Sequence, residues 1–218
     1  MPHPAVNVRP VRLPLGATGF ARLTGVSRET LATLQAYVGL LTQWNRRINL
    51  ISPNTLGDVW RRHLLDCAQL FRLLPRPATA VVVDIGSGAG LPGLVLAAMG
   101  AGQIHLVESD QRKAAFLREA ARIMDVTVTI HACRAETIRG LAADAVTARA
   151  CAPLDQLIDY AESFLTKRTV CLFLKGATAS EELAEAEHRW AMTVESIASI
   201  AEPGGVILKL TELHRVPG

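Results

Sequence analysis

The sequence predicts an α/β fold with a mostly parallel sheet, a C-terminal antiparallel hairpin and an N-terminal helical extension. From residue 80 onward, short apolar runs alternate with helix-patterned segments, which is typical of a parallel sheet covered on both faces. Two β-prone runs, 194–201 and 206–210, are separated by Glu-Pro-Gly-Gly, which predicts a hairpin. Before residue 80, apolar residues recur at spacings of three and four, which indicates amphipathic helices. A chain of 218 residues is long enough for one domain and such an extension.

The N-terminal part divides into an arm, residues 1–23, and the helical extension, residues 24–78. The arm carries four prolines and three arginines without any acidic residue, so we expect it to be flexible. In the extension, Ser27 can cap a helix with Glu29 in its first turn. A second helix is expected to follow Ser52-Pro53 and to end near Pro75. The apolar face of the first helix is predicted to comprise Leu31, Leu34, Val38, Leu41 and Trp44.

The remaining residues, 79–218, are predicted to form the nucleotide-binding domain. The predicted parallel strands are 81–85, 104–107, 126–132, 144–148 and 170–174. The predicted helices are 94–99, 111–124, 154–165 and 181–192, and the hairpin follows the last of them.

Charge is unevenly distributed along the chain. Residues 1–76 carry ten arginines and three acidic residues, a net charge of +7, whereas the rest has a net charge of −4. Because phosphate contacts favour Arg and Lys, the basic third suggests a polyanionic partner, with a solvated arginine surface as the alternative. The four cysteines form no CxxC pair, so we expect reduced packing residues and no metal site. Without an apolar run near about 18 residues, we expect a cytoplasmic protein without membrane association.

A glycine-rich loop is the strongest motif: Val-Asp-Ile-Gly-Ser-Gly-Ala-Gly-Leu-Pro-Gly at 83–93, where a strand passes into a helix. Glycine allows a tight turn and a close approach of backbone to a ligand, and Pro92 suits the first helical turn. Glu108 follows at the end of the next strand, where a carboxylate can bind both ribose hydroxyls of a nucleoside. Ser87, Gly88 and Gly90 are accordingly predicted to contact the cofactor.

Two cofactors fit this spacing. Residues 88–93 satisfy G-x-G-x-x-G, so an NAD-dependent oxidoreductase remains an alternative. Asp84 before the first glycine and the C-terminal hairpin favour S-adenosylmethionine (SAM), which would give S-adenosylhomocysteine (SAH) as product. A SAM-binding module without catalysis, such as a sensor or an assembly factor, is a further alternative.

Together these motifs resemble the RsmG (GidB) family, the 16S ribosomal RNA guanine-N7 methyltransferases, which have a class I SAM-dependent (Rossmann-like) fold. The resemblance covers about residues 28 to 210. The family pattern usually has Thr at Ile51 and Ser at Cys67, and often Ser at Ala148. The segments that carry the resemblance are Asn49-Leu50-Ile51-Ser52, Arg62-His63-Leu64-Leu65-Asp66, the glycine loop 84–93, Ala148-Arg149-Ala150 and Leu174-Lys175-Gly176.

The resemblance implies that Gly86 and Leu91 contact SAM, that Ala135 and Glu136 contact its adenine side, and that Arg149 completes the site. The first and fourth strands flank the switch point of such a sheet, which independently brings Arg149 close to the glycine loop. Arg149 and Lys175 are expected at the reacting centre. The side chains expected to contact RNA are Arg46, Arg47, Arg61, Arg62, His63, Arg149 and Lys175.

The resemblance also implies the reaction, methylation of N7 of one guanine in 16S rRNA, free or within the small ribosomal subunit. Neutral guanine already exposes a lone pair at N7, so no general base is expected. Cys151 could instead serve as a nucleophile toward cytosine C5, but no second cysteine or basic partner accompanies it. We expect the enzyme to be a monomer.

Overall fold

The computed structural model describes residue 11 and residues 14–216. In that part of the chain, seven strands form one sheet in the order β3-β2-β1-β4-β5-β7-β6. The first five strands in this order pair in parallel, whereas β7 runs antiparallel between β5 and β6. The strands are β1 (Val81–Ile85), β2 (Gln103–Val107), β3 (Val128–His131), β4 (Ala145–Arg149), β5 (Val170–Lys175), β6 (Trp190–Ala198) and β7 (Val206–Arg215). The predicted fold class is confirmed.

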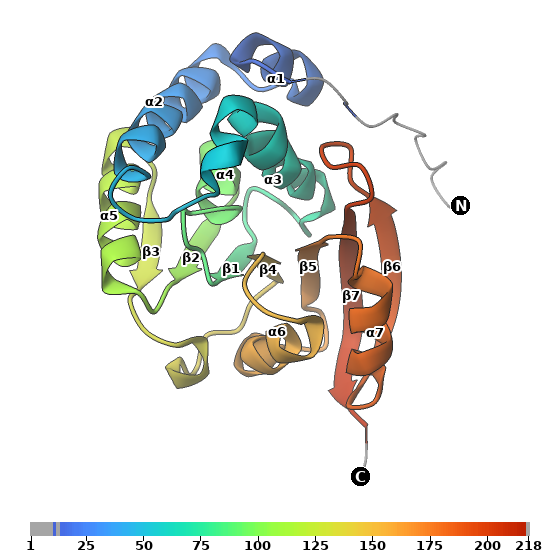
Figure 1. Ribbon diagram of the computed structural model, residues 1–218. Helices are drawn as coiled ribbons and strands as arrows, with labels where there is room; N and C mark the ends of the chain where they lie inside the picture. The colour runs from blue at the N-terminus through green and yellow to red at the C-terminus, as the bar shows by residue number, and fades with distance from the viewer. Residues whose placement is uncertain (1–10, 12–13, 217–218) are drawn as a thin grey trace.

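Helices cover both faces of this sheet (Figure 1). One face carries α2 (Arg28–Trp44), α4 (Gly93–Ala98) and α5 (Gln111–Met124), together with α1 (Ala17–Thr24) and α3 (Asp66–Ala68). The other face carries α6 (Leu154–Ala161) and α7 (Ala179–Glu187). The remaining turns are the 3₁₀ segments η1 (Pro53–Asp58), η3 (Gln69–Leu73), η4 (Ala135–Thr137) and η5 (Glu162–Phe164), and the π-helical η2 (Trp60–Leu65).

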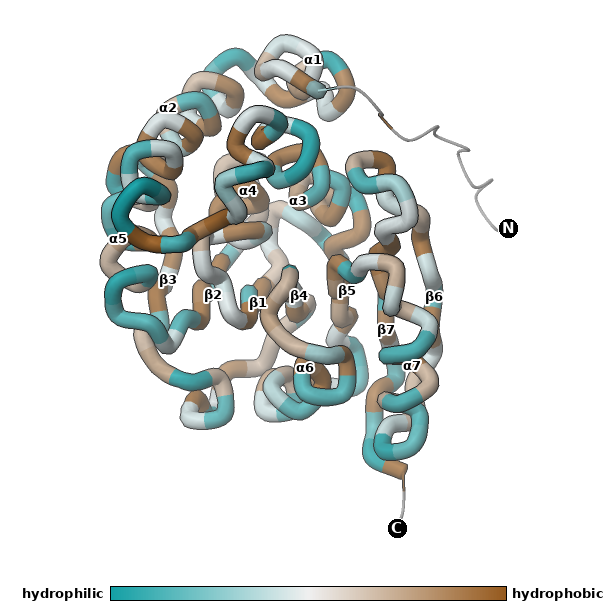
Figure 2. The backbone as a smooth tube through the Cα atoms, in the orientation of Figure 1, coloured by the Kyte–Doolittle hydropathy of each residue, from teal (hydrophilic) through white to brown (hydrophobic). Residues whose placement is uncertain are grey.

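The core consists of two apolar clusters separated by the sheet. Because successive side chains of a strand point to opposite faces, Val82 joins the cluster under α2, α4 and α5, and Val83 joins the cluster under α6. The extension contributes Leu34, Tyr37 and Leu41 to the first cluster. In Figure 2 strand β5 is largely brown, strands β6 and β7 are mixed, and polar residues colour much of the outer surface of the helices teal. The extension therefore shares its core with the sheet.

Several helix ends follow the chemistry expected of their caps. The Ser27 side chain accepts a hydrogen bond from the amide of Thr30 at the start of α2, as predicted. Asp110 similarly accepts from the amides of Arg112 and Lys113 at the start of α5. The observed α5 has the predicted bounds. None of the helices among the described residues is long and apolar enough to cross a bilayer.

The structure differs from the expected arm. Residues 17–24 form α1, because Phe20 is fully buried and packs against Trp60 with ring centroids 5.4 Å apart. The amide of Leu15 donates to Asp58, which fixes the chain just before this helix. Residues 1–10, 12 and 13 lie outside the described residues.

Two helix predictions are wrong in detail. The segment expected to be one helix up to Pro75 is instead a series of short 3₁₀, π and α turns, because Arg61, His63 and Asp66 bond to distant segments. The helix expected over 181–192 ends at Glu187, and β6 begins at Trp190. Trp190 is 2% exposed and pairs with Arg215 of β7, so burial of the indole favours the strand.

Candidate active site

The glycine loop begins where β1 ends, and the side chain of Asp84 fixes its backbone through hydrogen bonds. One carboxylate oxygen of Asp84 accepts from the amide of Gly93 at 3.1 Å, and the other accepts from the Thr147 hydroxyl at 3.0 Å. The Ser87 hydroxyl donates to the Asp84 carbonyl. Complete burial raises the pKa of Asp84 to about 7, although these hydrogen bonds oppose the shift. Asp84 thus ties the loop to the start of α4 and to β4.

Two glycines in this loop are required by its geometry. Gly86 has a φ of +64°, and a Cβ there would lie 2.2 Å from Sγ of Cys151. Gly88 has a φ of +54°, and a Cβ there would meet only the Gly86 carbonyl at 3.7 Å. A side chain at Gly86 would therefore collide with the loop after β4, whereas one at Gly88 would enter open space.

Tyr37 is a contact to this loop that the sequence did not reveal. Its hydroxyl, carried by α2, donates to the carbonyl of Ala89 at 2.7 Å. The ring is completely buried, which raises the pKa of the phenol and keeps it protonated as a donor. The residue lies on the helical core face of the extension, but its partner is 52 residues away, so periodicity alone predicts only burial.

Glu108 lies at the end of β2, where the sequence placed it, and is 7% exposed. One of its carboxylate oxygens accepts from the amide of Gly88 at 2.9 Å, and the other accepts from the amide of Asp110 at 2.8 Å. These bonds hold the carboxylate against the glycine loop. Glu108 is therefore positioned both to stiffen the loop and to receive a hydroxyl donor from a bound nucleoside.

A cavity of about 270 Å³ lies above these residues, at the carboxyl ends of β1, β2 and β4. Of the predicted cofactor contacts, Gly86, Glu108, Ala135 and Glu136 line it. Ser87, Gly90 and Leu91 are buried within the loop, and Gly88 is bonded to Glu108. The other lining residues include Lys113 from α5, Arg134 beside η4, and Tyr160 from α6.

Cys151 and Ala150 form the wall of this cavity that follows β4. Ala150 has a positive φ of +49°, which turns the chain sharply after the strand. Partial burial, with Asp84 and Glu108 nearby, raises the pKa of the Cys151 thiol. The thiol is therefore protonated at neutral pH, contrary to what a nucleophile would require.

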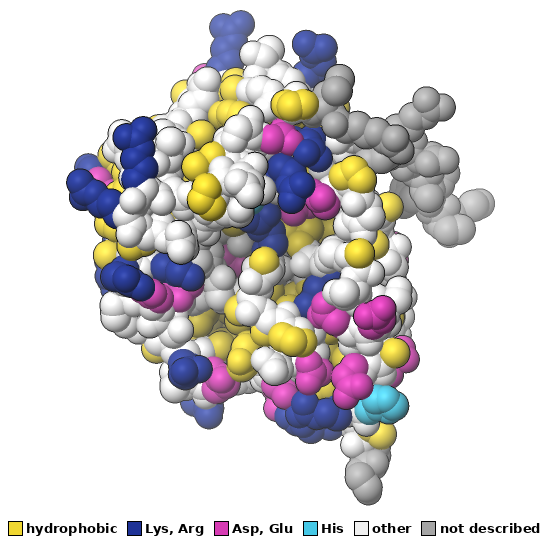
Figure 3. All heavy atoms as spheres, in the orientation of Figure 1, with side chains coloured by type: hydrophobic (Ala, Val, Ile, Leu, Met, Phe, Trp, Pro, Cys, Tyr) yellow, Lys and Arg dark blue, Asp and Glu magenta, His cyan; other side chains and the backbone are white. Residues whose placement is uncertain are grey.

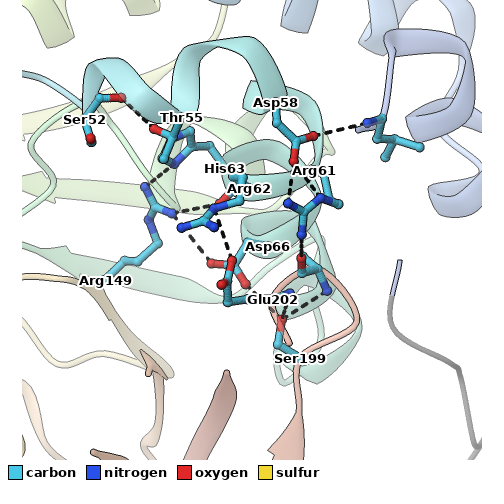
Figure 4. Close-up of polar contacts among 12 residues, drawn as sticks. Ser52, Thr55, Asp58, Arg61, Arg62, His63, Asp66, Arg149, Ser199 and Glu202 are labelled. Carbon is cyan, nitrogen blue, oxygen red and sulfur yellow. Dashed lines mark hydrogen bonds and ion pairs between the residues drawn. The ribbon is translucent and has the colours of Figure 1, made fainter. Parts of the chain in front are cut away.

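Arg149, the last residue of β4, points toward the extension (Figure 4). Its guanidinium donates to Nδ1 of His63 at 2.6 Å and to the carbonyl of Arg62 at 3.2 Å. Nη1 also lies 3.6 Å from the carboxylate of Asp66. Arg149 is thus placed at the switch point of the sheet, but its described contacts are with η2 and α3 and it is not among the residues that line the cavity.

Asp66 in turn joins the extension to the turn between β6 and β7. One oxygen of its carboxylate accepts from the hydroxyl of Ser199 at 3.1 Å and from the side-chain amide of Gln69 at 3.0 Å. The same Ser199 hydroxyl accepts from the amides of Ala201 and Glu202. Burial raises the pKa of Asp66, and the nearby Arg149 opposes this effect. The C-terminal hairpin is therefore fastened to the extension beneath Arg149.

The structure corrects the expected RNA contacts of Arg61 and His63. Arg61 is 9% exposed, pairs with Asp58 and donates to the carbonyl of Ala201. His63 is 7% exposed, and burial together with the charges of Arg149 and Arg62 lowers its pKa to about 3. Arg61 is thus committed to internal partners, and His63 carries no charge at neutral pH.

Lys175 is likewise an internal residue. Its ammonium donates to the carbonyl of Ala152 at 2.8 Å and to Glu182 at 2.6 Å, and its side chain is 8% exposed. Glu182 also accepts from the amide of Leu154, so this pair holds the chain on both sides of Pro153. In this structure Lys175 thus supports the loop after β4, and its expected roles in RNA contact and at the reacting centre stay predictions.

The remaining expected RNA contacts lie on the surface. Arg46 and Arg47 are exposed in the turn after α2, and Asn45 closes that turn by bonding to the amides of Leu50 and Ile51. Arg62 is half-exposed and forms an ion pair with Glu202 at 3.1 Å.

Comparison with known proteins gives a consistent result. The family model described as rRNA small subunit methyltransferase G matches residues 30–206. A ribosomal RNA small subunit methyltransferase G from Rhodospirillum centenum is 53% identical over 197 residues, covering 90% of this chain and 91% of the relative. Its counterpart from Granulibacter bethesdensis is 48% identical, with 98% of both chains covered.

Solved structures share the fold at low identity. A ribosomal protein L11 methylase from Lactobacillus delbrueckii subsp. bulgaricus has a TM-score of 0.56 and 16% identity, over 68% of this chain and 77% of that one. A precorrin-6y C5,15-methyltransferase from Geobacter metallireducens has a TM-score of 0.51 and 16% identity, over 74% and 89%.

Proposed function

Because the chain belongs to the rRNA small subunit methyltransferase G family, we propose that it transfers a methyl group from SAM to N7 of one guanine in 16S rRNA. The family match across residues 30–206 carries this proposal. The cavity at the carboxyl ends of the strands supports it, because ligands of open α/β sheets bind at that edge.

The residues around the cavity fit a nucleoside cofactor. Glu108 offers a fixed carboxylate for ribose hydroxyls. Because Gly86 has no Cβ, Cys151 of the loop after β4 can pack against the glycine loop and complete the cavity wall. Ala135 and Glu136 line the same cavity from η4, where an adenine would lie. The backbone of Gly88 is open to a ligand, because glycine has no side chain to fill the space beside it. When bound, SAM supplies an electrophilic methyl group on a sulfonium.

The chain then has to align and desolvate the two reactants rather than remove a proton. N7 of guanine presents its lone pair without deprotonation. The thiol of Cys151, which lies against the glycine loop, is protonated and therefore unsuited to nucleophilic attack on a base. Alignment by fixed groups can itself supply much of the rate enhancement. We accordingly assign Arg149 to positioning at the reacting centre.

The RNA is proposed to approach the face that Figure 3 shows. That face is hollowed between the extension and the α6–α7 side, and Lys and Arg side chains lie around and within the hollow. Arg46, Arg47 and Arg62 remain from the expected contacts as exposed or half-exposed cations of the extension. Guanidinium groups suit phosphates and can stack on bases.

We further propose that the enzyme acts as a monomer in the cytoplasm, on 16S rRNA or the small subunit that contains it. We also propose that the chain divides into a helical extension and a SAM-binding domain from residue 79, with α1 belonging to the extension instead of to the basic arm. The extension contributes the exposed arginines, and the domain contributes the cofactor cavity.

The decisive experiment incubates the protein with methyl-labelled SAM and small subunits that lack the modification. N7-methylguanine carries a fixed positive charge, so borohydride followed by aniline should cleave 16S rRNA at one position. Gly88→Asp is the matched control, because it adds a second carboxylate beside Glu108, which accepts from the Gly88 amide. The nearest atom to a Cβ there is 3.7 Å away, and Asp is among the side chains that accept a positive φ such as the +54° of Gly88. We expect this variant to fold and to lose both SAH binding and cleavage. Label that resists cleavage, or that enters protein or transfer RNA, would contradict the proposed product, and SAH binding without any transfer would indicate a non-catalytic module.

Two surface substitutions separate RNA docking from cofactor binding. Arg46→Glu combined with Arg47→Glu should leave SAH affinity unchanged and weaken binding to 16S rRNA. The plot of log affinity against log salt should flatten by roughly one for each phosphate group that the variant no longer neutralises. An unchanged salt slope would assign both arginines to the solvated surface.

A further inference from the structure

We propose that His63 is a positioning residue, which acts as a neutral hydrogen-bond acceptor and holds the guanidinium of Arg149 at the carboxyl end of β4. The inference rests on the proposed function, in which Arg149 serves the methyl-transfer site. His63, a buried residue of the extension, would thus affect cofactor binding through Arg149.

The chemistry of the two groups determines which of them donates in the contact between Arg149 and His63. A guanidinium has N–H donors and no acceptor, so Nδ1 of His63, 2.6 Å from Nη2 of Arg149, must offer its lone pair. The ring proton then resides on Nε2, which lies 2.7 Å from the hydroxyl oxygen of Thr55. That hydroxyl donates its own hydrogen to the carbonyl of Ser52 at 2.7 Å. One hydrogen on each of Nη2 of Arg149, Nε2 of His63 and the Thr55 hydroxyl thus has an acceptor in the series from Arg149 to Ser52 (Figure 4).

The opposite tautomer, or a doubly protonated ring, would place an N–H against the guanidinium. Burial of the ring and the neighbouring charges of Arg149 and Arg62 hold the pKa of His63 at about 3. The acceptor state therefore persists at neutral pH.

The local backbone brings the acceptors together. His63 lies in the π-helical turn η2, and its neighbour Arg62 presents a carbonyl to Nη1 of the same guanidinium at 3.2 Å. Such turns in helices frequently occur at functional sites. Asp66 follows one residue after the turn, and its carboxylate lies 3.6 Å from Nη1, longer than a hydrogen bond.

This geometry explains how His63 sets the position of Arg149. The nearby carboxylate attracts the guanidinium, whereas His63 and the Arg62 carbonyl hold it outside hydrogen-bond distance of Asp66. Without the His63 acceptor, the guanidinium can turn and form a shorter ion pair with Asp66. Arg149 directly precedes Ala150 and Cys151 of the cavity wall, and in the proposed function it positions the reactants there, so we expect that rotation to weaken cofactor binding.

Two conservative variants distinguish the acceptor from the volume of the side chain. His63→Asn retains an acceptor oxygen on Cγ, at the place of Nδ1. His63→Gln retains a polar group at the distance of Nε2 and lacks the Nδ1 acceptor. We expect SAH affinity to fall about tenfold in His63→Gln, in line with the loss of one hydrogen bond to a charged group, and about twofold in His63→Asn.

A double-mutant cycle excludes a merely structural effect. In an Arg149→Ala background, His63→Gln should cause no further loss of SAH affinity, because the group that it positions is absent. Equal losses in both backgrounds would overturn the proposal, as would equal affinities of the Gln and Asn variants. Wild-type SAH binding serves as the reference: if the wild type does not bind SAH, the proposed function fails instead.

A measurement on the wild-type protein keeps the proposal testable should the variants fail to fold. Nitrogen-15 NMR of the histidine rings distinguishes Nε2–H from Nδ1–H. We expect the His63 signal to show a neutral ring with its proton on Nε2 from about pH 5 to about pH 8, because this interval lies above the pKa of about 3. An Nδ1–H tautomer or a protonated ring would overturn the proposal.

Discussion

The carboxyl group of Asp84 is completely buried beneath the glycine loop, and its titration should control how stability depends on pH. Burial raises its pKa from 3.8 to about 7, although the hydrogen bonds from Thr147, Gly93 and Ser87 oppose this effect. The substitution Asp84→Asn removes the titration and keeps the geometry. The amide oxygen can still accept from the Gly93 amide, and the amide N–H can donate to the Thr147 hydroxyl.

The sign of the effect follows from proton binding in the two states. The pKa of Asp84 is 3.8 in the unfolded chain and about 7 in the folded protein. Between these two values the unfolded chain loses the Asp84 proton, whereas the folded protein retains it. The contribution of Asp84 to stability is therefore fully present below the unfolded pKa and is lost as pH rises through the folded pKa. The pKa difference corresponds to at most about 4 kcal/mol. Relative to wild type, Asp84→Asn should thus gain up to that amount across the interval.

Urea denaturation of both proteins at half-unit pH steps measures this difference directly, since all other titrating groups are common to both. Asp125→Asn is a suitable control for the loss of one carboxylate, because Asp125 is exposed at the end of α5 in a conformation that Asn also adopts. A difference between wild type and Asp84→Asn that stays constant with pH would refute the reasoning. It would mean that hydrogen bonding, and not burial, determines the ionisation of Asp84.

Two further predictions concern the same loop. Tyr37→Phe should destabilise the protein by about 1–3 kcal/mol in urea denaturation and weaken SAH binding, because it leaves the buried carbonyl of Ala89 without its donor. An unchanged free energy of unfolding would mean that water or another donor replaces the phenol. Gly86→Ala should lower SAH affinity by at least tenfold in calorimetric titration, because its Cβ would lie 2.2 Å from Sγ of Cys151 at a φ of +64°. Adding Cys151→Gly should recover part of that affinity, and no recovery would place the cause in backbone strain alone.

Local patterns were sufficient to predict the central elements. Strand β1 and helix α5 have the bounds expected from the sequence, because an apolar run and a capped amphipathic segment each encode their own structure. The hairpin was also predicted, since Pro-Gly-Gly between β-prone runs is a local turn signal. Glu108 was placed correctly at the end of its strand by spacing alone.

The errors arose where distant segments determine the structure. Arg61 looks like a surface cation in the sequence, but it donates to a carbonyl 140 residues further along the chain. His63 looks like a possible RNA contact, but its ring is buried between Thr55 and Arg149. The irregular turns of residues 53–73 exist because they direct these polar groups toward the sheet and the hairpin. No local pattern in the sequence encodes such a set of contacts.

The same contacts make the extension inseparable from the cofactor site. Tyr37 holds the glycine loop from one side, and His63 and Asp66 hold the end of β4 from the other. The extension also supplies a large part of the apolar cluster that covers β1 and β2. Removing it would expose that cluster and leave the Ala89 carbonyl and the Arg149 guanidinium without their described partners. The exposed arginines of the extension are thus carried by a segment that also holds the glycine loop and the end of β4. In the proposed function, a docked RNA and the cofactor would therefore bind to one connected support.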